Sequence, residues 1–256
     1  MAKERLSACM VLYHSGDAAM DTVACLEAAN ERIDLYIVDN STDDDLAERI
    51  RWRHPGVKIR AQKKNLGFGR ANNVVLDELQ SDYHLFINPD VTFEADLLTR
   101  MIAYMDKHQN AVALTPRVLN PDGTEQLLPK CAPTVRYLLG SRLARFGGVF
   151  ARWRREYTMT VNGTPHAPVS VFFATGCFML VRTEVLKKLN GFDKRFFLYH
   201  EDSDLSRRLA EQGPIIYHPD MIVTHDWRRE SAHSLKGLML HLWATVQYFA
   251  KWGLKW

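Results

Sequence analysis

The feature that most constrains the fold is a repeated alternation of short apolar runs with segments of helical character. The apolar runs, which indicate strands, are residues 6–13, 35–38, 57–61 and 84–87. The helix-like segments between and after them are residues 18–30, a stretch opening at 43–45, a stretch reaching about residue 79, and residues 94–107. Parallel strands need such crossovers. The alternation therefore predicts an α/β protein with a Rossmann-like, mostly parallel central sheet flanked by helices.

The composition fits one large globular domain that stays inside the cell. The chain has 256 residues, of which 46% are hydrophobic, and its formal net charge of +3 is too small to indicate a nucleic-acid partner. Its first apolar run ends at His14, which is too short for a signal peptide. The cysteines have no metal-binding spacing and are typical of a reducing cytoplasm: Cys9, Cys25, Cys131 and Cys177.

Polar loops follow the first three predicted strands, at the edge where open α/β sheets bind ligands. Tyr13 offers an aromatic ring to a base, and Asp39 offers a carboxylate to base or ribose hydroxyl groups. The glycine-containing stretch 65–73 allows its backbone to approach phosphates. These loops predict a nucleotide pocket. Neither Gly-x-Gly-x-x-Gly nor Gly-Lys-Ser/Thr is present, which weakens dinucleotide and P-loop interpretations.

The fourth predicted strand ends at Asn88-Pro89-Asp90, which brings one carboxylate to the same edge. Asp90 could ligate a hard cation such as Mg²⁺ or Mn²⁺, completed by the phosphates of a nucleotide. The alternative is that the tripeptide is only a turn.

A second informative stretch lies in the last third of the chain. Residues 171–182 predict a central strand, broken at Thr175-Gly176 where a substrate can approach the backbone. An aromatic run through Tyr199 and His200 then leads to three acidic residues at a helix start: Glu201, Asp202 and Asp204. These carboxylates could merely complement the helix dipole. Aromatic walls and like charges would instead raise a carboxyl pKa and favour a general base.

Three segments together resemble a known family: Val38-Asp39-Asn40-Ser41, Asn65-Leu66-Gly67-Phe68-Gly69-Arg70-Ala71-Asn72 and Asn88-Pro89-Asp90. They are similar to family 2 glycosyltransferases of the GT-A fold, within the bacterial rhamnosyltransferase-like branch, over nearly the whole chain. The resemblance implies that Asp39 contacts the nucleobase and that Asp90 is the metal-binding acid of an Asp-x-Asp motif. Asn88 replaces the first Asp of that motif. The nucleotide-binding residues are then expected to be Tyr13, Asp39, Asn65, Gly67, Arg70 and Asn88.

The same resemblance assigns the acceptor side. Gly-x-Phe-Asp followed by Glu-Asp matches the family's acceptor motif, which makes Asp202 the catalytic base, Glu201 its supporting acid and Asp204 the fallback. His225 is expected near the metal or diphosphate, where Arg228, Arg229 and His233 could also meet phosphates. The expected acceptor-binding residues are Thr175, Gly176, Tyr199, His200 and Asp204.

The resemblance implies an inverting transfer of a sugar, from dTDP-L-rhamnose in this branch, to a saccharide or polyprenyl-linked saccharide acceptor in bacterial surface polysaccharide synthesis. The expected cofactor is Mg²⁺ or Mn²⁺. A UDP- or GDP-sugar donor remains an alternative. Two other classes of protein also stay open. One is a nucleotidyltransferase, although this chain lacks the basic glycine-rich loop that such an enzyme usually has after its first strand. The other is a catalytically inert nucleotide-sugar-binding scaffold, which Asn88 would permit.

The predicted domain covers residues 1–234, with a nucleotide-binding half at about 1–116 and an acceptor-binding half at about 117–234. Residues 136–155 mix arginines with aromatic residues, and residues 235–256 predict an apolar and basic helix. The uncharged run 237–250 is too short to span a bilayer. Both segments could lie at a membrane interface or pack on the core. One expectation is that the protein is cytoplasmic and located at the inner face of the cytoplasmic membrane.

Overall fold

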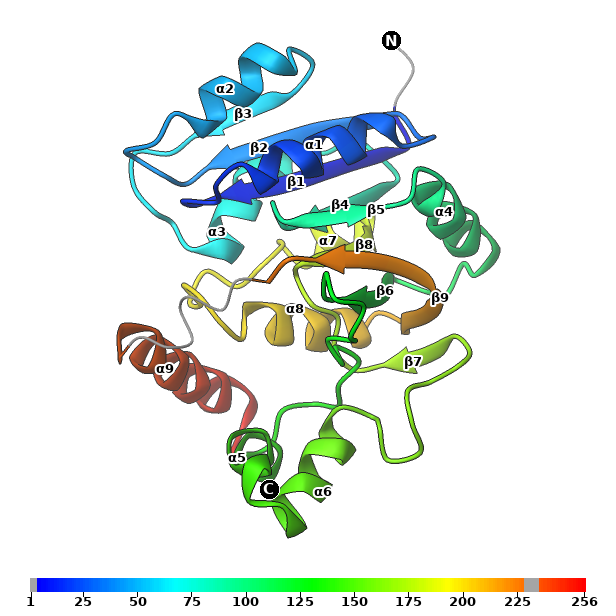
Figure 1. Ribbon diagram of the computed structural model, residues 1–256, viewed down its shortest axis with the longest axis vertical. Helices are drawn as coiled ribbons and strands as arrows, with labels where there is room; N and C mark the ends of the chain where they lie inside the picture. The colour runs from blue at the N-terminus through cyan, green and yellow to red at the C-terminus, as the bar shows by residue number, and fades with distance from the viewer. Residues whose placement is uncertain (1–3, 228–234) are drawn as a thin grey trace.

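The computed structural model describes residues 4–227 and 235–256 of the chain (Figure 1). Its first half is a parallel sheet in which β1 (Leu6–Leu12) lies between β2 (Ile33–Asp39) and β4 (Tyr83–Ile87), with β3 (Lys58–Ala61) outside β2. The connections are α1 (Ala18–Ala28), α2 (Leu46–Arg53), and α3 (Phe68–Asn72) followed by the 3₁₀ helix η1 (Asn73–Glu78). This arrangement confirms the α/β class and the strand–helix alternation predicted from the sequence.

The second half adds antiparallel pairs to the same sheet. The added strands are β5 (Val91–Phe93), β6 (Ala113–Leu119), β7 (Val169–Val171), β8 (Phe178–Arg182) and β9 (Ile215–His225). The sheet runs β3-β2-β1-β4-β8-β6-β9-β5, and β7 pairs with β9. The predicted strand 171–182 is wrong as one element, because β7 pairs with β9 whereas β8 pairs with β4 and β6. The residues between them, 172–177, form a loop.

β9 is one continuous strand from Ile215 to His225, although it contains Pro219. Its pairing with β6 shifts between Pro116 and Arg117, which leaves extra residues of β9 at the proline-containing stretch without breaking the strand. A local bulge of this kind re-aims the side chains beyond it. The shift therefore affects how the C-terminal end of β9, with His225, approaches the loop after β4.

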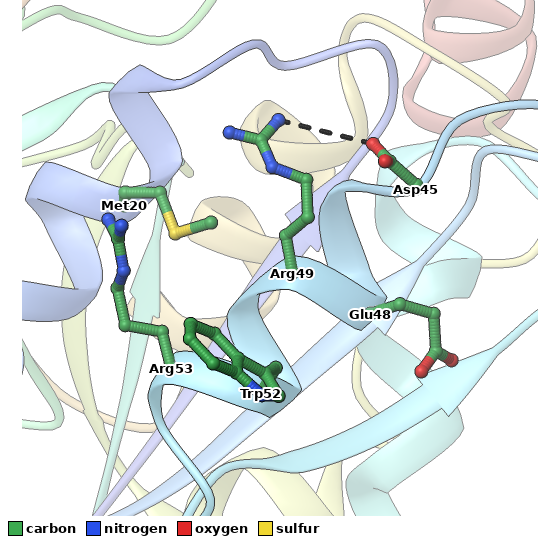
Figure 2. Close-up of a pocket in the computed structure, with 6 residues that line it drawn as sticks. All are labelled: Met20, Asp45, Glu48, Arg49, Trp52 and Arg53. Atoms are coloured by element: carbon green, nitrogen blue, oxygen red, sulfur yellow. Dashed lines mark ion pairs between the residues drawn. The ribbon is translucent and has the colours of Figure 1, made fainter.

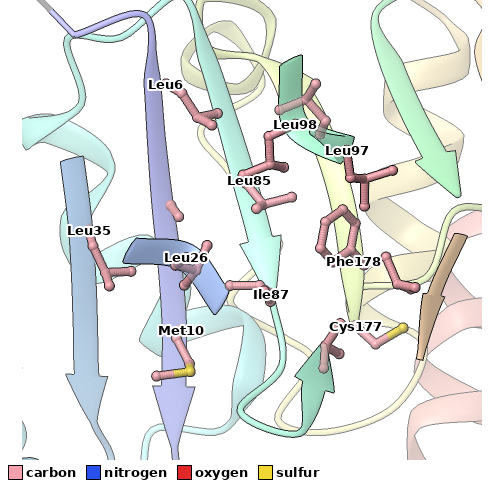
Figure 3. Close-up of a cluster of buried hydrophobic side chains, with 14 of the residues drawn as sticks. Leu6, Met10, Leu26, Leu35, Leu85, Ile87, Leu97, Leu98, Cys177 and Phe178 are labelled. Carbon is pink, nitrogen blue, oxygen red and sulfur yellow. The ribbon is translucent and has the colours of Figure 1, made fainter. Parts of the chain in front are cut away.

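Apolar side chains cover both faces of the sheet, as expected for parallel strands with helices on each side. Leu6 and Met10 of β1 lie in one buried cluster, together with residues of α1 and α4 (Leu97–Lys107), as Figure 3 shows. Cys9 and Val11, which alternate with them, lie in the opposite cluster with side chains of α3 and α8 (Glu201–Ala210). The period-two alternation along β1 thus separates two cores.

The remaining helices lie toward one end of the molecule, except for α7 (Thr183–Lys188) beside β8. They are α5 (Val135–Leu143), the short η2 (Ala144–Phe146), α6 (Gly148–Tyr157) and α9 (Leu235–Trp252). Figure 1 places α5, α6 and α9 at the bottom, at the end opposite α2. Within residues 4–227 and 235–256, no helix is both long enough and apolar enough to cross a membrane.

Candidate active site

The loops after β1 and β2 are joined by hydrogen bonds around Asp39. The Asp39 carboxylate accepts a bond from the backbone N–H of Ser41 (3.0 Å), and the Ser41 hydroxyl accepts one from the backbone N–H of His14 (3.1 Å). Asp39 is buried at the end of β2, and this burial raises the pKa of its carboxyl group. Tyr13, next to His14, is half exposed. The structure therefore brings an accessible aromatic ring and a fixed carboxylate to one edge.

Asn40 and Asn65 connect this edge to the glycine-containing loop. The Asn40 amide donates to the Asn65 side-chain oxygen (2.8 Å) and accepts a bond from the backbone N–H of Leu66 (2.8 Å). The same Asn65 oxygen accepts a bond from the backbone N–H of Gly67 (2.8 Å). Asn65 is thus occupied in shaping the loop, and its contact with a nucleotide stays a prediction.

The glycine-containing loop also packs directly on the segment that precedes α8. Gly67 has φ +79°, and a Cβ at this position would lie 2.0 Å from the carbonyl oxygen of Phe197. Phe68 donates its backbone N–H to that carbonyl (3.1 Å). The Arg70 guanidinium donates to the carbonyl oxygen of Lys194 (2.6 Å). Gly67 and Arg70, predicted to bind nucleotide, therefore also hold residues 65–73 against residues 191–200. We call the first stretch the donor-side loop and the second the acceptor-side segment.

Asn88, Asp90 and His225 meet where β4 ends. Asp90 Oδ1 lies 3.2 Å from His225 Nε2, and the Asn88 amide nitrogen lies 3.4 Å from the same ring atom. Gln126, which the sequence analysis missed, accepts a bond from His225 Nδ1 through its side-chain oxygen (3.0 Å) and donates its amide nitrogen to the His225 carbonyl (2.8 Å). Gln126 follows the turn formed by Pro121-Asp122-Gly123, in a short segment where only its polarity distinguishes it. The structure brings together the two residues predicted as metal ligands.

The His225 ring is buried, and its charge depends on its neighbours. Burial alone lowers the pKa of the imidazole, but hydrogen bonds with Asp90 and Cys177 raise it to about 10. The Asp90–His225 pair therefore supplies an imidazolium beside a carboxylate when His225 is protonated. When His225 loses that proton, the ring nitrogen and the carboxylate oxygen could both ligate a cation.

The donor atoms fit a divalent cation that a nucleotide helps to hold. Asp90 Oδ1 is buried beside His225 Nε2 (3.2 Å), so loss of the imidazole proton would leave both atoms available as ligands. Carboxylate oxygen suits Mg²⁺ and Mn²⁺, whereas imidazole favours later transition metals. Among the described residues, no group of three or more His, Cys, Asp or Glu side chains could hold a metal. Asp90 and His225 would consequently need phosphate oxygens or water to complete the coordination shell.

Asp202 lies in the first turn of α8 and is bonded to the loop between β7 and β8. Burial raises the pKa of its carboxyl group, while nearby Lys130 and hydrogen bonds from the backbone N–H groups of Ser203 and Gly176 oppose that rise. The loop is fixed to α8 by Ser206, whose hydroxyl bonds both backbone groups of Ala174 (3.0 and 3.1 Å). The predicted Gly176 thus positions Asp202 with its backbone.

The same loop connects Asp202 to the end of β4, where Asp90 and His225 meet. Its Cys177 carbonyl accepts a bond from the backbone N–H of Asn88 (2.8 Å), and its Thr175 hydroxyl accepts one from the backbone N–H of Cys177 (3.3 Å). A Cβ on Gly176 would lie 2.7 Å from the ring of Phe68. Glycine is therefore required at this position for packing against α3, a reason that differs from the predicted approach of substrate.

His200 and Glu201 directly precede Asp202 in the chain. Burial and the neighbouring Asp202 charge raise the pKa of Glu201 to about 8, and Glu201 Oε2 has no hydrogen-bond partner. Both Tyr199 and His200 have positive φ, of +70° and +62°, which turns the chain sharply into α8. The His200 ring bonds Thr245 of α9 through Nε2 (3.1 Å), and burial lowers its pKa to about 4. A neutral His200 therefore packs between α8 and α9.

Lys130 is a site residue that the sequence analysis missed. It is half buried, its Nζ lies 4.9 Å from the centre of the Phe173 ring, and its backbone forms a bridge with Phe173. Burial lowers the pKa of Lys130, while the charge of Asp202 raises it. A single lysine between Pro129 and Cys131 carries no recognisable motif, and only the folded chain brings it to Asp202.

Asp204 is fully buried and bonds other parts of the protein. One oxygen accepts bonds from Lys251 Nζ (2.5 Å) and Trp252 Nε1 (2.8 Å) of α9, and the other accepts one from Arg208 (2.8 Å). Lys251 also bonds Asp193 (2.7 Å). These contacts fasten α9 to α8. An acceptor role for Asp204 stays a prediction.

A separate hollow of about 390 Å³ lies between α1 and α2 (Figure 2). It is lined by Met20, Asp45, Glu48, Arg49, Trp52 and Arg53. No residue predicted from the sequence to bind donor, metal or acceptor lines it, so it is distinct from the site described above. Arg228, Arg229 and His233, which were expected near phosphates, lie outside the described residues.

The family model for glycosyl transferase family 2 matches residues 7–190, which include the donor-side loops and Asp90. The chain belongs to this family. It is therefore a glycosyltransferase, as the sequence resemblance implied.

Curated relatives agree with this assignment. The chain is 28% identical over 239 residues to N-acetylglucosaminyl-diphospho-decaprenol L-rhamnosyltransferase of Mycobacterium tuberculosis, covering 88% of this chain and 75% of the relative. It is 25% identical over 241 residues to rhamnosyltransferase WbbL of Escherichia coli, covering 88% of this chain and 85% of the relative.

Solved structures show the same fold. The mannosyltransferase PcManGT from Pyrobaculum calidifontis, in complex with GDP-Man and Mn²⁺, superposes with a TM-score of 0.64 at 16% identity and covers 98% of this chain. S. aureus TarS 1–349 in complex with UDP-GlcNAc superposes with a TM-score of 0.63 at 17% identity and covers 96% of this chain. This chain spans 64% and 66% of those two chains. At such identities the likeness shows the GT-A fold alone.

Proposed function

We propose that this glycosyltransferase transfers L-rhamnose from dTDP-L-rhamnose to a polyprenyl-linked saccharide, with inversion at the anomeric carbon. The fold and the family leave the donor and the acceptor open. Support for rhamnose comes from two curated relatives that are both named rhamnosyltransferases. Support for the lipid-linked acceptor comes from the relative whose name includes a diphospho-decaprenol substrate.

The observation that carries the proposed mechanism is the loop 174–177, which touches both halves of the site. Its Gly176 N–H bonds Asp202, and its Cys177 carbonyl bonds Asn88. A base and a leaving-group site on either side of one loop suit a single displacement, in which the acceptor attacks opposite the departing diphosphate. Asp202 would take the proton of the acceptor hydroxyl while that oxygen bonds to the anomeric carbon. The bond from that carbon to the diphosphate breaks, and the nucleotide leaves with its electron pair.

The remaining residues would bind and orient the two substrates. Tyr13 and Asp39 would bind the base and ribose, and the loop at Gly67 would border the diphosphate. Asp90 and His225 would hold Mg²⁺ or Mn²⁺ with the phosphates, and this cation would supply charge neutralisation for the leaving group. Glu201, protonated near neutral pH because of its raised pKa, would leave the negative charge of the pair on Asp202.

We also infer a cytoplasmic location at a membrane surface, where the lipid of the acceptor is anchored. The described cysteines are all free thiols, which suits a reducing compartment.

Nucleotide binding with and without metal tests the donor side of the proposal. A ligand at about 100 times its Kd should stabilise the fold by about 2.7 kcal/mol, so a thermal-shift panel of dTDP, UDP, GDP and ADP will rank the nucleobases. We expect dTDP to stabilise most, and Mg²⁺ or Mn²⁺ to strengthen its effect in the native chain more than in Asp90→Asn. Preference for UDP or GDP would discard rhamnose and keep the family assignment.

The catalytic role of Asp202 is tested by replacing it with Asn. Losing a general base typically costs about 10²- to 10⁴-fold in rate. Asp202→Asn should therefore lose transfer to that extent and keep the dTDP thermal shift. Glu201→Gln is the matched variant, because it keeps the shape of the neighbouring side chain, and it should lose much less. Equal losses in the two variants would contradict the assignment of Asp202.

A further inference from the structure

An apolar stripe runs along the outer face of α9. Its side chains lie three or four residues apart and are exposed: Met239, Leu242, Trp243 and Val246, at 71, 51, 63 and 58%. The opposite face of the helix is buried through Ala244 and Tyr248, so the stripe is not needed to hold α9 on the protein. Four large apolar side chains exposed side by side indicate an interaction surface.

A second exposed apolar group lies on the neighbouring helices. It consists of Leu139 of α5, Phe146 of η2 and Val149 of α6. The C-terminal residues join it to α9, because Trp256 packs edge-on against Trp153 (6.1 Å between ring centres) and the Lys255 carbonyl accepts the backbone N–H of Val135 (2.9 Å). Arg142 of α5 also bonds His241 of α9 (3.4 Å). The two apolar groups therefore belong to one region, at the lower end of Figure 1.

The charges around this region are mostly positive. Between Glu125 and Glu184 the sequence contains a single acidic residue, Glu156, and after Glu230 it contains none. Glu156 already bonds Arg152 (2.9 Å) and Arg136 (3.5 Å). The exposed cations of α5, η2 and α6 are Arg142, Arg145, Arg152, Arg154 and Arg155. Apolar side chains bordered by arginines and lysines, with aromatic residues among them, match the chemistry of an anionic lipid headgroup layer.

We propose that this region, formed by α9 and the α5–α6 pair, docks the protein on an anionic lipid bilayer. The inner face of α9 touches the acceptor side of the site, since Thr245 bonds His200 and Lys251 bonds Asp204. Docking would thus place the first turn of α8 close to the headgroup layer. The proposal deepens the inferred membrane location by naming the surface that would bind lipid, and it requires neither the rhamnosyl donor nor Asp202.

Vesicle sedimentation tests the proposal with the full chain. The probes are vesicles of phosphatidylcholine alone and of phosphatidylcholine mixed with phosphatidylglycerol. We expect the protein to sediment with the mixed vesicles, to bind phosphatidylcholine alone at least about tenfold more weakly, and to be released by salt. The double variant Leu242→Ser/Trp243→Ser should bind the mixed vesicles about tenfold or more weakly than the native chain.

Trp52→Ser is the matched control, because Trp52 is 84% exposed between Arg51 and Arg53 on α2, at the opposite end of the molecule. It should sediment like the native chain. A cooperative thermal unfolding transition near that of the native chain will show that each variant is folded. Should the double variant fail to fold, Arg145→Gln/Arg154→Gln, at two exposed positions, provides an independent test and should also weaken binding.

Two outcomes would overturn the proposal. One is absence of sedimentation of the folded native chain with mixed vesicles. The other is a native chain that is dimeric without lipid and becomes monomeric on Leu242→Ser/Trp243→Ser, which would show that a second copy covers the stripe. Neither outcome would affect nucleotide binding, so failure of this proposal is distinguishable from failure of the proposed donor.

Discussion

The charge beside Asp202 comes from Lys130, a residue 72 positions earlier in the chain. Burial raises the pKa of Asp202, and Lys130 opposes that rise. In the proposed mechanism Asp202 acts as a general base only when deprotonated, so its pKa would set the acid limb of the pH profile. Lys130 would then extend activity toward lower pH.

Lys130→Gln should raise the pKa of Asp202 and move the acid limb of kcat/KM to higher pH, by about one unit for a nearby charge. Lys130→Arg, which keeps the charge, should leave the limb near its native position. The measurement is kcat/KM for sugar transfer across the pH range, for both variants. A lower but unshifted profile for Lys130→Gln would show that Lys130 acts through packing on Phe173 instead.

Individual positions show what the sequence could and could not reveal. Asp39, Asp90 and Asp202 follow strands or open a helix, and local pattern together with family resemblance places them at one edge. Lys130 and Gln126 carry no local pattern, because they approach Asp202 and His225 only through pairings distant in sequence. Asp204 looks like a member of the acidic cluster in the sequence, but helical geometry turns it toward Arg208 and α9.

At the scale of elements, the donor-side loop depends on a glycine that meets the segment before α8. Gly67→Ala would place a methyl group 2.0 Å from the Phe197 carbonyl oxygen, at φ +79°. We expect the variant to lose about 2–4 kcal/mol of unfolding free energy, from backbone strain plus the clash. Urea unfolding measures this loss.

Gly123→Ala is the matched control for that prediction. Gly123 has φ +81°, and nothing lies within 4 Å of a Cβ at this position. Gly123→Ala should therefore lose only the unfolding free energy that the strained backbone costs, about 1 kcal/mol. Equal losses in the two variants would mean that the contact with Phe197 contributes nothing.

The attachment of α9 depends on the buried carboxylate of Asp204. Asp204→Asn would leave Arg208 without its charged partner and Lys251 with Asp193 alone, in a buried setting, which should cost about 3–5 kcal/mol of unfolding free energy. Glu48→Gln removes one partner of the exposed Glu48–Arg51 pair and should cost less than about 1 kcal/mol. Chemical unfolding of both variants provides the comparison, and a small loss in Asp204→Asn would contradict a structural role for this cluster.

At the scale of the whole molecule, the donor-side loop and the acceptor-side segment are hydrogen-bonded directly to each other. The Asn73 amide bonds both backbone groups of Phe192 (2.8 Å each), in addition to the Phe197 and Lys194 contacts of Phe68 and Arg70. Nucleotide that orders residues 65–73 should therefore also order residues 191–204, which lead into α8 and Asp202. The two substrate sites would then be coupled through this shared packing.

Hydrogen exchange with and without dTDP measures this coupling. We expect slower amide exchange in residues 65–73 and in residues 191–204 when nucleotide is bound, and unchanged exchange in α4, which contacts neither segment through these bonds. Arg70→Ala removes one of the connecting bonds and should reduce the protection of residues 191–204 more than that of residues 65–73. Protection confined to residues 65–73 in the native chain would mean that the donor loop binds nucleotide without ordering the acceptor side, and that Asp202 is positioned by the loop 174–177 and α9 alone.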